Sequence, residues 1–180
     1  MNLITKYNVN HGLDVNLRDK QYVPLDQRTL DQKNAKVLFY FFPPEQHGSI
    51  PHISDHMVVI GPELDKDNFP PYVKGKIHTP PGLIDSGQVL EKAAEFFEPD
   101  ILICWYDGIG TKGLKNTQNF KGIKVMILGD CHHMHKSLEK NLHYAKTEKF
   151  DLCLFHDRRM VSVFRKFTEA KLLFGGALLA

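Results

Sequence analysis

Short apolar runs alternate with amphipathic stretches along the second half of the chain. Residues 125–128 and 152–155 are apolar runs that end in polar residues, and between them Leu138, Leu142 and Ala145 recur at helical spacing. This order predicts a strand, a helix and a second strand. Two strands joined by a helix normally form a right-handed parallel crossover. Both polar tips are therefore expected at the carboxyl edge of one sheet, where open α/β sheets bind ligands.

The same alternation extends over the chain from residue 36 onwards. It predicts main strands at 36–42, 57–60, 101–106 (the third main strand), 125–128, 152–155 and 171–174, with a brief extra strand near 72–78. Strands with little polar alternation are typical of parallel sheets covered on both faces. The predicted fold class is α/β: a three-layer, Rossmann-like, open and mainly parallel sheet of about six strands with flanking helices, in the order 3-2-1-4-5-6.

Three further helices are expected outside the central strand–helix–strand unit. The first begins at Asp85-Ser86, buries Val89, Ala93, Phe96 and Phe97, and ends at Pro99; a short second helix lies around 114–120; the third buries Met160, Val163, Phe164 and Phe167.

The ends of the chain suggest how it is organised. Residues 1–35 are polar and weakly patterned, and we expect an arm or edge hairpin there, with the Rossmann-like domain at 36–180. The sequence stops at Gly175-Gly-Ala-Leu-Leu-Ala180, directly after a predicted strand. This predicts half of a two-domain protein, completed by a C-terminal domain or by a homodimer.

Composition narrows the classes of partner. The 180 residues suit one domain, and 42% apolar residues can bury a full core. The net charge of +2 comes from intermixed signs without a basic block, so nucleic-acid binding is not indicated. No run approaches membrane-spanning length, so no membrane span is expected. The absence of a signal-peptide core and the odd number of cysteines (Cys104, Cys131, Cys153) favour a reduced, cytoplasmic setting.

Asp130-Cys-His-His-Met-His135 is the strongest polar cluster at a predicted strand end. Asp130 either caps the following helix or lines a ligand crevice, while His132 or His133 can act as a general base because imidazole titrates near neutrality. No metal is expected, because neither paired cysteines nor a His-Glu-x-x-His pattern completes a ligand set. Cys131 is interpreted as a semi-buried cysteine rather than a nucleophile.

Three other polar segments follow predicted strands and are candidates for the same edge. Their candidate ligand-binding residues are His47, Gly48, Ser49, Asp107, Gly108, Gly110, His156 and Asp157. Asp157 has a second interpretation, as the cap of the following helix beside solvated Arg158 and Arg159. Pro43-Pro-Glu-Gln-His-Gly stands where a dinucleotide-binding fold would carry Gly-x-Gly-x-x-Gly, and the P-loop pattern is absent, so no tightly bound nucleotide cofactor is expected.

Four segments carry a family resemblance: Pro99-Asp-Ile-Leu-Ile-Cys-Trp, Val125-Met-Ile-Leu-Gly-Asp-Cys-His-His, Tyr144-Ala-Lys-Thr-Glu-Lys-Phe-Asp-Leu-Cys-Leu-Phe, and the strand entering Gly175-Gly-Ala. They resemble the N-terminal, acceptor-side half of a GT-B-type glycosyltransferase of the CgeB-like group. The resemblance implies that a second half binds a sugar nucleotide as donor substrate, and that Asp130, His132 or His133 deprotonates an acceptor hydroxyl. The 180 residues alone are then expected to be inactive.

Two alternatives stay open from the residues alone. One is a non-catalytic Rossmann- or flavodoxin-like module that binds a small ligand or a partner protein. It is not a receiver domain, because the residues after the first strand, Phe41-Phe42-Pro43-Pro44, supply no acidic pair. The other is a metal-dependent hydrolase built on the histidines.

Overall fold

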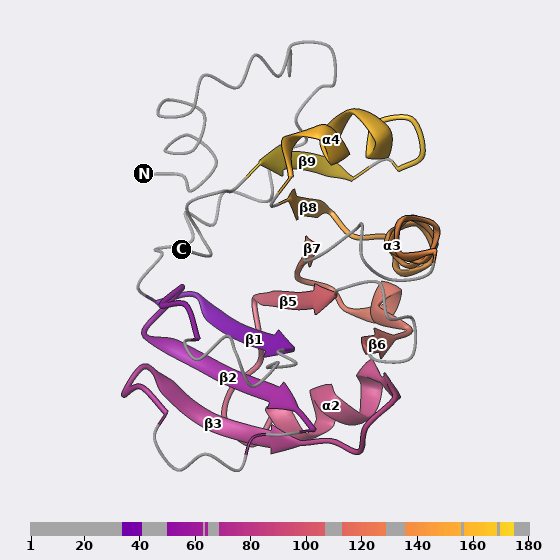
Figure 1. Cartoon of the computed structure of the whole chain (residues 1–180). Coiled ribbons are helices and arrows are strands. Elements are labelled where there is room, and N and C mark those ends of the chain that lie inside the picture. Colours follow the sequence, from indigo (N-terminus) through magenta and orange to yellow (C-terminus); the bar gives the residue numbers. More distant parts are fainter. Residues whose placement is uncertain are drawn as a thin grey trace.

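A seven-stranded parallel sheet forms the framework of the domain (Figure 1). The computed structural model describes residues 34–40, 50–62, 64, 69–106, 113–128, 136–155, 157–168 and 170–174. The strands of the sheet are β1 (Lys36–Tyr40), β2 (His56–Gly61), β3 (Val73–His78), β5 (Ile101–Tyr106), β7 (Ile123–Leu128), β8 (Leu152–Phe155) and β9 (Lys171–Phe174). Two short parallel strands, β4 (Leu83–Asp85) and β6 (Gly113–Lys115), form a separate pair. The predicted Rossmann-like α/β class is confirmed.

The strands lie in the order β3-β2-β1-β5-β7-β8-β9. Numbered along the chain within this sheet, the order is 3-2-1-4-5-6-7. The predicted order places residues 101–106, its third strand, at the edge beside residues 57–60, and this placement is wrong. That place belongs to β3 at the edge, whereas β5 pairs with β1 in the interior of the sheet.

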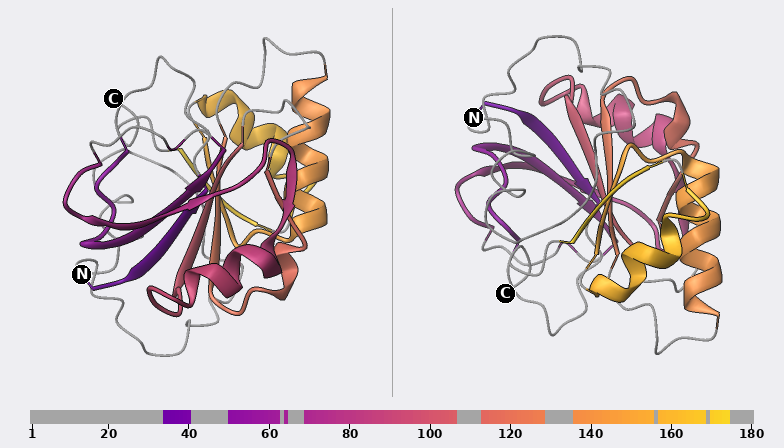
Figure 2. Two further views of the ribbon diagram at one scale, coloured as in Figure 1. Left: turned by 90° about the horizontal axis from the view of Figure 1, so that it is seen from below. Right: turned by 90° about the horizontal axis from the view of Figure 1, so that it is seen from above.

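The three described α-helices lie on one face of the sheet (Figure 2). They are α2 (Ser86–Ala93), α3 (Ser137–Glu148) and α4 (Arg158–Phe164). Their buried side chains share one apolar cluster with Leu38 of β1, Leu102 of β5 and Met126 of β7. Right-handed crossovers that lead in one direction across a parallel sheet all pass over the same face, which explains this one-sided arrangement.

The opposite face carries a second apolar cluster. It contains Val37 and Phe39 of β1, and the irregular segments 50–53 and 69–72 contribute further side chains to it. The sheet therefore lies between a layer of helices and a second apolar layer, as expected for a three-layer fold.

Helix α2 begins where the sequence predicts. The side chain of Asp85 accepts a hydrogen bond from the Gly87 N–H at 2.9 Å, and Val89 and Ala93 are buried. Phe96, however, is 44% exposed, and Phe167 after α4 is 58% exposed, so the predicted burial of both is wrong. The helices end at Ala93 and Phe164, and a residue beyond the last turn no longer follows the buried stripe.

The prediction of a short helix around residues 114–120 is also wrong. The chain forms strand β6 there, followed by a single 3-10 turn, η2 (Thr117–Asn119). Asn116, between the two, has a left-handed backbone with φ of 63°, which ends the strand and prevents one continuous helix.

Glu148, the last residue of α3, joins three segments at the amino edge of the sheet. It is only 4% exposed. Its carboxylate accepts hydrogen bonds from the N–H of Thr117 at 2.7 Å and from the Thr117 hydroxyl at 3.0 Å. Its backbone carbonyl accepts one from Lys124 Nζ at 3.3 Å. Burial lowers the pKa of Lys124, although the carboxylates of Asp151 and Glu148 act in the opposite direction.

We expect Glu148→Ala to lower the free energy of unfolding by about 1–3 kcal/mol, because it leaves the buried N–H of Thr117 unpaired, whereas the Thr117 hydroxyl keeps its bond to the backbone carbonyl of residue 148 at 3.1 Å. Glu139→Ala on the same helix is the control, since the Glu139 side chain is 73% exposed and lies 3.8 Å from Lys136 Nζ. Its effect is expected to stay below about 0.5 kcal/mol. Urea denaturation measures both, and equal losses would contradict the structural role of Glu148.

Candidate functional site

The sheet changes its winding direction between β1 and β5. From β1 the chain proceeds to β2 and β3 on one side, and all later strands of the sheet add on the other side. At such a point the connections from two neighbouring strands lead away over opposite faces, so a crevice opens outside their carboxyl ends. Ligands of open α/β folds bind in this crevice. The β1–β5 switch point is therefore the candidate site.

The segments that carry the predicted site residues leave the sheet at neighbouring strand ends. Tyr106 of β5 pairs with Leu128 of β7, and Leu128 pairs with Phe155 of β8, so these three strands end level with one another. Tyr40 of β1 pairs with Cys104, two positions earlier. Segments 41–49, 107–112, 129–135 and residue 156 thus follow the carboxyl ends of four adjacent strands.

Most of the predicted site residues lie outside the described part of the chain, and their roles stay predictions. They are Asp130, His132, His133, His47, Gly48, Ser49, Asp107, Gly108, Gly110 and His156, and the same holds for Cys131 and His135.

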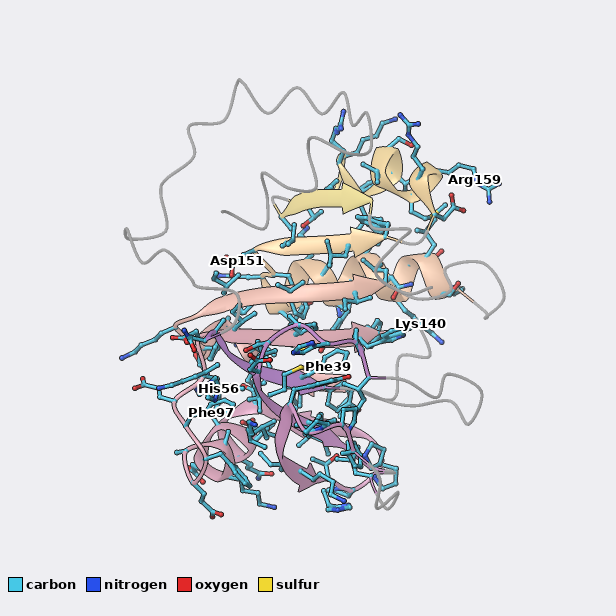
Figure 3. The ribbon with its side chains drawn as sticks, turned by 90° about the vertical axis from the view of Figure 1, so that its left-hand side faces the viewer. Phe39, His56, Phe97, Lys140, Asp151 and Arg159 are labelled. Atoms are coloured by element: carbon cyan, nitrogen blue, oxygen red, sulfur yellow. The ribbon has the colours of Figure 1, made fainter. Side chains whose placement is uncertain are left out.

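Asp157 is the predicted site residue that the structure describes. It is the N-cap of α4 and accepts a hydrogen bond from the Arg159 N–H at 2.9 Å, which confirms the predicted cap. Its carboxylate also pairs with the Arg159 guanidinium, with Nη2 at 2.7 Å, and this raises the pKa of Arg159. Figure 3 shows Arg159 at the carboxyl side of the strands, whereas Asp151 and His56 lie at the amino side. Ligand binding by Asp157 stays a prediction.

Helix α3 starts close to the carboxyl end of β7. Its N-cap is Lys136, which has a φ of 55° and makes no side-chain capping hydrogen bond. Lys136, and not Asp130, therefore occupies the N-cap position of this helix. Ser137 and Asn141, in the first two turns, are buried, with 2% and 0% exposure.

Two tyrosines contact the residues on either side of segment 107–112. The rings of Tyr106, the last residue of β5, and Tyr144 of α3 are stacked with centroids 4.1 Å apart and planes at 13°. The Tyr144 hydroxyl donates to the carbonyl of Leu114 at 2.6 Å and accepts from the Leu114 N–H at 3.1 Å. The sequence analysis missed Tyr144, although its spacing of three residues from Asn141 and four from Glu148 places all three on one helix face.

A polar clasp joins β6 to the start of α2. Asn116 Nδ2 donates to Asp85 Oδ2 at 2.6 Å, and the Ser86 hydroxyl donates to the Asn116 carbonyl at 3.0 Å. The hydrogen bonds from Asn116 and then from the Gly87 N–H lower the pKa of Asp85. The start of α2 and the residue that follows β6 are thereby tied together.

Among the described residues, two cysteines are further candidates for reactive groups. Cys104 and Cys153 are buried free thiols, and burial raises the pKa of both, that of Cys153 to about 12. Buried thiols of this kind are unreactive. Within the described ranges, no three His, Cys, Asp or Glu side chains are grouped so that they could hold a metal ion. Nor does any helix of that part of the chain have the length and apolarity to cross a membrane.

Comparisons of the chain with known protein families, with curated proteins and with solved structures give no match. The strand order, and the residues that follow each strand, are the features of the chain that indicate its function.

We expect the stabilising effect of Asp85 to disappear in acid. Because its pKa in the folded state is lowered, the carboxylate stabilises the fold at pH values above the ordinary aspartate range, and this contribution is lost as the pH falls through the folded-state pKa. The Tm difference between wild type and Asp85→Ala should thus be largest near pH 7 and shrink from about pH 4 downwards. Glu91→Ala, on the exposed side of α2, is the control. A Tm difference for Asp85→Ala that does not change with pH would contradict the clasp.

Proposed function

We propose that this chain is a Rossmann-like domain that binds a small polar ligand at the carboxyl edge of its sheet, over the β1–β5 switch point. The strand order is the observation that supports the proposal. Segments rich in Asp, His and Gly follow β1, β5 and β7, which are adjacent strands, and this is where open α/β sheets form their ligand crevice.

The reaction that we propose for this site is sugar transfer, with the chain as the acceptor-side half of a sugar-nucleotide-dependent glycosyltransferase. The Rossmann-like sheet agrees with the half-domain that the resemblance implies, although many functions share this fold. One of His132, His133 and Asp130 takes the proton of an acceptor hydroxyl. The hydroxyl oxygen then bonds to the anomeric carbon of the donor sugar, and the nucleoside diphosphate leaves.

In this proposal, acceptor binding and donor binding belong to two different halves of the complete protein. The chain described here supplies the acceptor side and the base, while a second half holds the sugar nucleotide as donor substrate. No tightly bound cofactor takes part. We therefore expect the native open reading frame to continue past Ala180 for another domain of similar size. A reading frame that ends there would remove the two-domain enzyme and leave the non-catalytic binding module.

We expect His132→Ala or His133→Ala, whichever residue is the base, to lower kcat of the complete protein by about 10²–10⁴-fold. The assay follows nucleoside diphosphate release from a panel of sugar nucleotides. His143→Ala, an exposed histidine on α3, is the matched control and should leave kcat unchanged.

Transfer that survives both substitutions and Asp130→Ala would contradict the assignment of the base. Saturable binding of a sugar by the complete protein, with no turnover of any donor, would instead favour the non-catalytic module.

A further inference from the structure

We infer that Tyr144 is a positioning residue for the switch-point site, because it holds both ends of segment 107–112. The inference rests on the proposed function, since this segment carries Asp107, Gly108 and Gly110. Tyr144 does not touch the proposed ligand in this scheme. It acts through the backbone from which those residues extend.

The ring of Tyr144 fixes the first end of the segment. It stacks on Tyr106, the residue directly before position 107, at 4.1 Å between centroids. Tyr106 is 5% exposed and Tyr144 is 7% exposed, so water does not compete for this contact. Offset stacking of buried aromatic rings adds to the stability given by their buried area alone.

The hydroxyl of Tyr144 fixes the second end. It hydrogen-bonds to both backbone groups of Leu114, which is fully buried. Burial raises the pKa of Tyr144 well above its usual range, so the hydroxyl keeps its proton and can donate and accept at the same time. Without this hydroxyl, one buried N–H and one buried C=O would lose their partner.

Gly113 shows how closely the two ends approach each other. Its φ is 146°, and a Cβ placed there would lie 3.2 Å from the Tyr144 hydroxyl and 3.4 Å from two ring atoms of Tyr106. The backbone at the second end therefore lies against both tyrosines. A side chain at position 113 would be strained by the backbone angle and would push this end away from the tyrosine pair.

The position of Tyr144 on α3 connects two parts of the proposed site. The same helix begins at Ser137, directly after the segment that carries Asp130, His132 and His133. Helix α3 thus contacts the last residue of β5 through Tyr144 and begins, along the chain, directly after the segment that follows β7. This is the supporting layer that a binding site needs to keep its contacting residues in a fixed geometry.

The experiment compares Tyr144→Phe with Tyr72→Phe in the full chain. Each substitution removes one hydroxyl that bonds to backbone, and Tyr72 donates to the Ile50 carbonyl at 2.6 Å, in the irregular layer on the other face of the sheet. In Tyr144→Phe we expect the amides of residues 113–115 to exchange with deuterium roughly tenfold faster, and trypsin to cleave faster after Lys112, while exchange in β1 and β7 is unchanged. Tyr72→Phe should change neither readout. Gly113→Ala should reproduce the effect of Tyr144→Phe.

Ligand binding is measured separately with Trp105, the single tryptophan of the chain, which directly precedes Tyr106. Its fluorescence is followed during titration with glucose, galactose and N-acetylglucosamine. We expect Kd for a sugar that binds wild type to rise about tenfold in Tyr144→Phe.

The two readouts separate the two claims. Uniformly faster exchange, or unchanged exchange at 113–115, would overturn the role of Tyr144 whatever the wild type binds. The expected exchange pattern in a protein that binds none of the sugars would support the tyrosine contact and count against the proposed function.

Discussion

Burial of the central strands on both faces is the constraint on which the rest of the domain depends. In β1, Val37 and Phe39 point to one apolar cluster and Leu38 to the other, and all three are fully buried. Strands of this kind leave no place for polar side chains along their length, so the polar residues of the chain gather where the strands end. Parallel pairing then brings those ends to a common edge, and β1 and β5 form a change of winding direction, the kind of point at which open α/β sheets bind ligands.

The same constraint explains how much of the fold the sequence predicted. Six of the seven strands of the sheet correspond to predicted apolar runs, because each run is both continuous and bounded by turn residues, and the edge strand β3 corresponds to the brief extra strand predicted near 72–78. The errors in the predicted strands and helices occur where the pattern of apolar and polar residues is too short to be informative. Strands β4 and β6 have three residues each, and Leu114 is buried by pairing with Ile84 rather than by any helical stripe. Phe96 continues the helical spacing in the sequence, but the helix has ended before it.

Some residues of the candidate site can be predicted from the sequence, and others cannot. Strand-end residues can be predicted, because a polar pair after an apolar run marks the carboxyl end of a strand. The residues that we infer to position the site cannot, because their contacts join distant positions. Tyr144 bonds to a backbone 30 residues away. On α3 the buried face also contains Ser137, Asn141 and Glu148, polar residues that a search for hydrophobic stripes assigns to solvent.

The place of β1 in the sheet has a consequence for how the chain folds. Its neighbours are β2 and β5, and the backbone N–H of Lys36 bonds to the carboxylate of Asp100, 64 residues later. During synthesis β1 emerges first, yet it acquires its second neighbour only when residue 106 has left the ribosome. A strand with four buried residues therefore waits until then for its second partner. Val-Leu-Phe-Tyr at positions 37–40 has the composition that pairs readily with other chains, so early protection of this strand should govern how much of the protein reaches its native state.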